Sequence, residues 1–260
     1  IVEMLLCFDE AGEVSLTEKE KDCLKQWQAL TDASNNSEIV KMAKATFARY
    51  DDVINDEIQF RYVLQSVKAI DSVGCDKTLR DIHIACQLYR VIDHLCKPLS
   101  DKMMKLVEDE ITLPFARKAV LDLNDKYLAI QKRDISKSAS LKSADAVKEM
   151  SDGEKILRKL IEPYKGKIIL LDIWGTWCGP CKAALSHSQE EYERLAPYDM
   201  VFLYLANGSS DESWKNVIKE YNVTGDNVVH YNLPDEQQSA VEHFLKVSSF
   251  PTYKLIDEEG

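Results

Sequence analysis

The chain has 260 residues, of which 45% are apolar, and it carries a formal net charge of -11 at pH 7. It is long enough for two domains of ordinary size, and no uninterrupted apolar run approaches the roughly 18 residues that a membrane-spanning helix needs. Both halves of the chain are acidic and would repel phosphate backbones. We therefore expect a globular protein with no membrane span and no nucleic-acid partner.

The first 133 residues show the spacing of amphipathic helices. Apolar residues recur three and four positions apart from about residue 15 onward, as on one face of a helix. The opening stretch, residues 1–8, fits a strand or the start of a helix equally well. The predicted helices lie at about 16–30, 39–50, 58–70, 77–96, 101–111 and 114–130. These stripes predict an all-helical N-terminal domain of five or six helices over residues 1–133.

The composition changes after residue 133. Residues 134–153 are rich in serine, lysine and small side chains, which is typical of a linker. Short apolar runs then alternate with helical patterns. The predicted order is a helix at 154–164, a strand at 168–173, a helix to about 195, a strand at 200–205, a helix at 214–221, a strand at 228–231 and a helix at 235–245. These elements form a second predicted domain, residues 154–260.

Two cysteines follow the first of these strands, in the stretch Trp174-Gly175-Thr176-Trp177-Cys178-Gly179-Pro180-Cys181. Residues three apart on a helix have Cβ atoms roughly 5–6 Å apart, close to the spacing that a disulfide needs. Cys178 would lie at the start of a helix, where free N–H groups favour a thiolate. We therefore predict that Cys178 is a nucleophile and that the less exposed Cys181 resolves the mixed disulfide. This requires that the two sulfurs meet and that solvent can reach Cys178.

A metal-binding role is the first alternative for this pair. Zinc sites need a second pair of ligands at similar spacing. His83 with Cys86 and His94 with Cys96 are the nearest candidates, but no set of four ligands emerges from them. We therefore predict no metal and no cofactor. The remaining cysteines are interpreted as small buried apolar residues on helix faces, namely Cys7, Cys23, Cys75, Cys86 and Cys96.

Two segments resemble a known family. Residues 171–181, with Trp-Cys-Gly-Pro-Cys intact, resemble the active-site strand and turn of the thioredoxin superfamily, and residues 247–253 resemble its cis-proline loop. The spacer between them is similar to that of the TlpA-like branch, bacterial thiol-disulfide oxidoreductases that work outside the cytoplasm. The resemblance covers about residues 151–260 and implies an α/β thioredoxin-like fold there, after the all-helical domain.

The resemblance implies roles for individual residues. Asp172 occupies the place of the carboxylate that lies under the second cysteine and helps to deprotonate it. Its apolar neighbours predict burial, which would raise its pKa toward a useful value. The TlpA-like branch commonly carries an acid and a proline where this chain has Ala184 and Ser186. The expected surroundings of the cysteines and the partner-binding surface comprise Trp174, Trp177, Gly179, Pro180, Phe250 and Pro251.

The resemblance also implies a function. Gly179 and Pro180 between the cysteines resemble reducing thioredoxins, so we expect a reductant of protein disulfides that is recharged by an upstream thiol reductant. Oxidase or isomerase activity is the nearest alternative, and a protein-binding scaffold formed by the helical domain is another. Family likeness implies a bacterial extracytoplasmic location.

A complete domain of this family would continue past Gly260 with one more strand and a helix. We therefore expect the thioredoxin-like domain to lack these two elements, and the sheet to have an unpaired edge or to borrow a strand from another chain.

Overall fold

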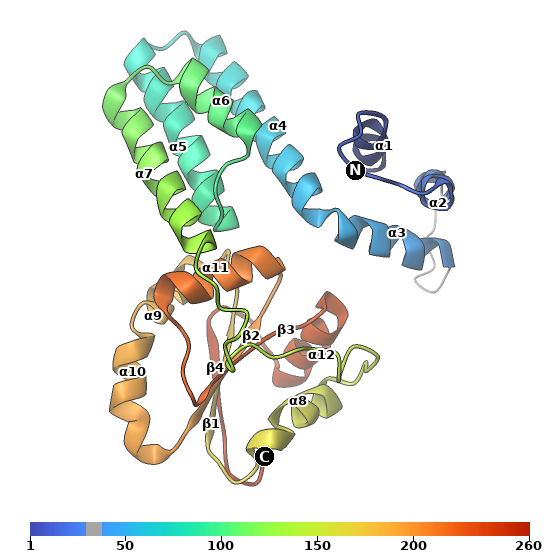
Figure 1. Ribbon diagram of the computed structural model, residues 1–260, viewed down its shortest axis with the longest axis vertical. Coiled ribbons are helices and arrows are strands. Elements are labelled where there is room, and N and C mark those ends of the chain that lie inside the picture. The colour runs from blue at the N-terminus through green and yellow to red at the C-terminus, as the bar shows by residue number, and fades with distance from the viewer. Residues whose placement is uncertain (30–37) are drawn as a thin grey trace. The chain divides into compact units, whose positions relative to one another are not determined.

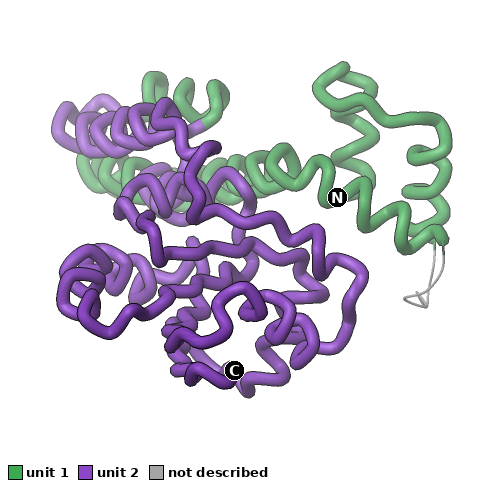
Figure 2. The backbone as a smooth tube through the Cα atoms, turned by 60° about the horizontal axis from the view of Figure 1, so that its bottom comes forward, with its two compact units in different colours: residues 1–87, 100–110 green, residues 88–99, 111–260 purple. Residues whose placement is uncertain are grey.

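The computed structural model describes residues 1–29 and 38–260 (Figure 1). Leu30, at the end of the first predicted helix, lies outside the described residues. The chain forms two compact units (Figure 2): residues 1–87 with 100–110, and residues 88–99 with 111–260. Helix α5 (Lys77–Leu95) contributes to both.

The first unit is helical. Besides the beginning of α5, it contains α1 (Val2–Glu10), α2 (Glu18–Ala29), α3 (Glu38–Arg49), α4 (Asp51–Val73) and α6 (Asp101–Glu110). The opening stretch of the chain is therefore a helix. The predicted apolar stripes meet in a core, where Leu5 and Leu24 are fully buried and the rings of Trp27 and Phe47 pack edge to face at 5.2 Å.

The second unit is built on a four-stranded sheet. Its elements after α5 are α7 (Pro114–Gln131), α8 (Gly153–Ile161), β1 (Ile169–Trp174), α9 (Gly179–Leu185), α10 (Ser188–Leu195), β2 (Val201–Ala206), α11 (Asp211–Tyr221), β3 (Val228–Asn232), α12 (Asp235–Leu245) and β4 (Thr252–Ile256). The strand order is β3-β2-β1-β4, with β4 antiparallel and the other strands parallel. The predicted alternation of strands and helices is confirmed, except that the helix after the cysteines is interrupted between α9 and α10.

The two faces of the sheet carry different side chains. One face presents Ile169, Leu171 and Ile173 to an apolar core that also contains residues of α8 and α12. The opposite face packs on α10 through Tyr192 and Phe202, whose ring centroids are 4.5 Å apart, and on α11. Figure 1 shows the sheet between these two groups of helices. Because side chains alternate along a strand, Asp172 lies on the α10 face.

The edge strands differ in how they are covered. Within the described part of the chain, β4 has no strand on its outer side, as predicted, and Tyr253 and Leu255 on it are 48% and 70% exposed. On β3, the backbone of His230 bonds to residues 140–142, with His230 N–H donating to Ser140 O at 2.7 Å and Lys142 N–H donating to His230 O at 3.0 Å.

These contacts divide the chain at other places than the sequence suggests. Val147, within the predicted linker, is fully buried in the core beside the sheet. Helix α7 also joins this unit, because Tyr127 donates to Glu220 of α11 at 2.8 Å and Gln131 donates to Glu212. The polar side chains of residues 134–153 therefore indicated a linker, but the backbone of this segment forms hydrogen bonds that attach it to the sheet.

Candidate active site

The two cysteines lie at the junction of β1 and α9. Cys178 is the N-cap of α9, and its Sγ accepts a hydrogen bond from the backbone N–H of Cys181 at 3.1 Å. The two residues form a disulfide with an S–S distance of 1.98 Å and a Cα–Cα distance of 5.2 Å. The predicted meeting of the sulfurs at a helix start is confirmed. The same N–H group, and the positive end of the helix, would stabilise a Cys178 thiolate.

Access to this pair is narrow. Cys178 is 4% exposed and Cys181 1% exposed, which is the predicted order. Gly179 and Pro180 lie exposed in the first turn of α9, and Trp177 is 41% exposed. A partner sulfur must therefore approach Cys178 beside Trp177 and the first turn of the helix.

The predicted proline loop lies against this turn. The Phe250-Pro251 peptide bond is cis, as predicted. The Phe250 ring meets the Trp177 ring edge to face, with centroids 5.2 Å apart. Trp174, by contrast, is fully buried at the end of β1, and its indole Nε1 has no hydrogen-bond partner within the described structure.

Asp172 is buried in the sheet, as predicted. It is 6% exposed, and its Oδ1 has no hydrogen-bond partner among the described residues. Burial, with a smaller contribution from the negative charge of Glu191, raises the pKa of Asp172 to about 7. A carboxyl group with this pKa can exchange a proton near neutral pH.

The end of α5 also lies beside the turn that contains the disulfide, residues 175–181, which we call the redox turn. The sequence did not indicate this contact. Lys182 follows Cys181 and is 8% exposed, and its ammonium group donates to the backbone oxygen of Asp93 at 2.8 Å and to Oδ1 of Asp93 at 3.0 Å. Cys96 Sγ lies 3.6 Å from the backbone oxygen of Thr176. These residues are 80 or more positions apart in the chain, so no local pattern could connect them.

The other cysteines differ from one another in burial. Cys23 and Cys96 are buried as predicted, and burial raises the pKa of Cys96 to about 11. The prediction is wrong for Cys7 and Cys86, which are exposed, and for Cys75, which is half-buried between α4 and α5 and not on a helix face. Among the described residues, no group of three or more histidine, cysteine or acidic side chains could hold a metal ion.

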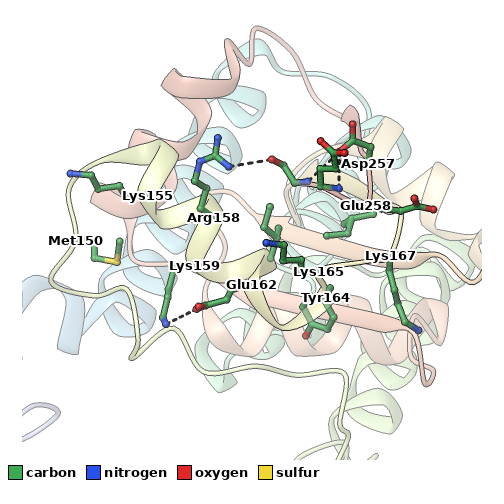
Figure 3. A pocket seen from close by; sticks show the side chains of 14 residues that line it. Met150, Lys155, Arg158, Lys159, Glu162, Tyr164, Lys165, Lys167, Asp257 and Glu258 are labelled. Carbon is green, nitrogen blue, oxygen red and sulfur yellow. Dashed lines mark hydrogen bonds and ion pairs between the residues drawn. The ribbon is translucent and has the colours of Figure 1, made fainter.

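A pocket lies between α8 and the residues after β4 (Figure 3), away from the cysteines. Several of the charges that line it are already engaged, since Lys159 pairs with Glu162 at 2.7 Å and Arg158 donates to the backbone oxygen of Gly260 at 3.2 Å. We assign it no part in the chemistry of the disulfide.

In the described part of the chain, none of the helices has the length and apolar character of a membrane span.

Comparison with known proteins agrees with this geometry. Residues 166–260 match the model of a family described as thioredoxin-like. The chain is 29% identical over 117 residues to the thiol-disulfide oxidoreductase ResA of Bacillus subtilis, covering 44% of this chain and 59% of that protein. It is 28% identical over 109 residues to ResA of Bacillus thuringiensis, covering 42% and 58%. The chain thus spans less than two thirds of the length of these relatives.

A similar solved structure is the thioredoxin domain of a thiol-disulfide oxidoreductase from Bacteroides vulgatus, at 24% identity and a TM-score of 0.34, covering 38% of this chain and 69% of that one. Residues 166–260, which match the family model, contain β1, both cysteines and the proline loop.

Proposed function

We propose, from the premise that residues 166–260 form a domain of the thioredoxin superfamily, that this protein reduces disulfide bonds in polypeptide substrates. One observation supports this most directly: Cys178 and Cys181 are within bonding distance at the start of α9, with a backbone N–H directed at Cys178 Sγ. The pair can therefore open and close without rearranging the strand and helix that hold it.

The proposed reaction has two exchange steps. In the reduced protein, the Cys178 thiolate attacks one sulfur of the substrate disulfide, forms a mixed disulfide and expels the other substrate sulfur as a thiolate. The Cys181 thiolate then attacks Cys178 Sγ, which releases the second substrate sulfur and forms the Cys178–Cys181 disulfide. Two electrons pass to the substrate, whose two thiolates take up protons.

Asp172 would assist the second step. A carboxyl group with a pKa near 7 can accept the Cys181 proton at neutral pH and return it when the disulfide is reduced again. An upstream thiol reductant would supply the electrons for that return. The exposed Trp177 and the neighbouring Phe250 would contact the substrate chain.

Insulin reduction tests this proposal. The wild-type protein with dithiothreitol should precipitate the insulin B chain, whereas Cys178→Ser should lose turnover. Cys181→Ser, reduced first and then mixed with insulin after removal of dithiothreitol, should accumulate a mixed disulfide that gel electrophoresis without reductant detects. Cys86→Ser, at an exposed cysteine on α5, is the matched control and should retain full activity. Undiminished turnover by Cys178→Ser would overturn the proposal and favour a binding role for the helical residues 1–133.

The direction of electron flow has a separate test. A reductant should have a reduction potential near that of thioredoxin, about -270 mV, whereas a value near -120 mV would indicate an oxidase. The TlpA-like resemblance supports a bacterial extracytoplasmic location. Fractionation of the source cells tests this, and recovery of the protein with the cytoplasm would contradict it.

A further inference from the structure

Trp177, the residue before the proposed nucleophile, is held by a backbone carbonyl after β2. Its indole N–H donates to the oxygen of Asn207 at 3.1 Å. The ring also needs Gly175, because a Cβ atom there would lie 2.6 Å from Trp177 Nε1 and 3.0 Å from Asn207 O. The position of the Asn207 carbonyl therefore determines where the indole ring lies.

The same carbonyl also fixes Thr176. Ser209 Oγ donates to Asn207 O at 2.9 Å and accepts the backbone N–H of Thr176 at 3.1 Å. A carbonyl oxygen has two lone pairs, and here Trp177 and Ser209 occupy both. The two residues that precede Cys178 are thus both positioned by Asn207.

Asn207 is in turn held by helix α12. Its side-chain Nδ2 donates to both carboxylate oxygens of Glu242, at 2.8 and 3.0 Å, and its backbone N–H donates to Trp174 O at 2.7 Å. Glu242 is half-buried and also accepts a hydrogen bond at 2.7 Å from Gln238, which is 2% exposed. Glu242 forms no ion pair with any residue that the structure describes. The Glu242 carboxylate therefore accepts hydrogen bonds from two side-chain amides, those of Asn207 and Gln238.

We infer that Glu242 is a positioning residue for the redox turn. Through Asn207 it holds Thr176 and Trp177 in place, and so it sets the rate at which the Cys178–Cys181 pair exchanges with a partner. This inference rests on the proposed function of the two cysteines. We call the Asn207–Glu242 contact the clamp.

A reversal of the two clamp residues tests the inference. Glu242→Gln removes the carboxylate but keeps the shape of the side chain. Asn207→Asp places two carboxylates face to face. The double variant exchanges amide and carboxylate and so restores a charge-assisted hydrogen bond. Glu154→Gln on α8, where an exposed carboxylate pairs with Arg158, is the matched control.

We expect kcat/KM for insulin to fall about fivefold in Glu242→Gln and about twentyfold in Asn207→Asp, and to return to within about twofold of wild type in the double variant. The control should not change. In a Trp177→Phe background, which lacks the indole N–H, Glu242→Gln should have a smaller effect than in wild type, because only the route through Ser209 to Thr176 remains. Thermal unfolding of each variant shows whether a lower kcat/KM comes from a loss of folding. Only a loss of positioning predicts both that the double variant regains activity and that the effect of Glu242→Gln depends on Trp177.

Equal kcat/KM in Glu242→Gln and wild type would overturn the inference, as would additive losses in the double variant or an undiminished effect in the Trp177→Phe background. The rate at which dithiothreitol reduces the Cys178–Cys181 disulfide provides a readout without a protein substrate. If the wild-type protein failed to reduce insulin, the proposed function would fall, and the same pattern of loss and restoration in the dithiothreitol rate would still decide whether the clamp positions the turn.

Discussion

Two buried titratable side chains lie in the same row across the sheet, and burial shifts their pKa values in opposite directions. Asp172 on β1 pairs with Tyr204 on β2, which pairs with His230 on β3. Burial favours the neutral form of both groups, so it raises the pKa of Asp172 to about 7 and lowers the pKa of His230 to about 4. At neutral pH the first group is poised to exchange a proton, and the second is fixed in its neutral form.

The surroundings of the two side chains also differ. His230 Nε2 lies 2.7 Å from the backbone oxygen of Val223, and the imidazole ring stacks on Tyr204 with centroids 4.6 Å apart. Asp172 Oδ1 and His230 Nδ1 both lack a hydrogen-bond partner among the described residues, so an unsatisfied atom alone does not separate the two groups. Their pKa values do, because only that of Asp172 lies near neutral pH. The row thus combines a packing residue on β3 with Asp172, the proposed proton acceptor, on the strand that leads to the cysteines.

The largest expected effect is on the stability of Asp172→Asn. A carboxyl group whose folded pKa is about 7 costs stability as the pH rises from its unfolded pKa of 3.8 through 7. The cost reaches about 4 kcal/mol at pH 8, and asparagine removes it. Urea unfolding of the oxidised protein should therefore show that the variant is more stable than wild type at pH 8 but not at pH 4. An equal difference at both pH values would contradict the raised pKa.

His230→Phe should show the opposite pH dependence. Because the folded pKa of about 4 is below the ordinary value of 6.5, the wild-type residue contributes stability above pH 6.5 that is lost as the pH falls toward 4. The expected loss is about 3 kcal/mol. The phenylalanine variant lacks this loss, so its urea midpoint should vary less between pH 7 and pH 4. His243→Gln, at an exposed position, is the control, and its pH dependence should match that of wild type.

A smaller effect is expected on the reaction itself. Asp172→Asn cannot accept a proton, so turnover of insulin at pH 7 should fall about tenfold. This loss is smaller than the roughly 10²- to 10⁴-fold rate enhancement that a directly acting general base usually contributes. The rate profile of wild type should rise through about pH 7, the pKa of Asp172, and this limb should be absent from the variant. A variant that kept the limb would assign it to another group.

The smallest expected effect concerns the centre of the row. The hydroxyl groups of Tyr192 and Tyr204 lie 2.8 Å apart, and burial raises the pKa of both. Tyr204→Phe should lower the free energy of unfolding by about 1 kcal/mol, the usual contribution of one hydrogen bond. Insulin turnover should not change, and a tenfold loss would show that the hydroxyl group takes part in proton transfer.

The sequence predicted those parts of the site that depend on neighbours in the chain. The strand, the cysteine pair and the helix start form one continuous segment, and the apolar neighbours of Asp172 indicated its burial. Contacts between distant segments left no such signal. The bonds of Lys182 to Asp93 and of Asn207 to Glu242 join residues 89 and 35 positions apart, and only the fold brings them together.

The prediction of helices was reliable where a Pro or Gly marked their ends. Pro114 opens α7, and Gly74 follows α4 in the left-handed conformation, with φ +68°. The interruption between α9 and α10 has no such marker. Ser186 is the C-cap of α9, His187 is the N-cap of α10, and neither breaks a helix by its own propensity.

The segment that bonds to the outer side of β3 matters for anyone who wishes to produce residues 154–260 alone. A fragment starting at residue 154 would expose the backbone groups of His230 that residues 140–142 now satisfy. Open strand edges promote association between molecules. A recombinant fragment should therefore begin well before Ser140, so that this segment still shields the strand.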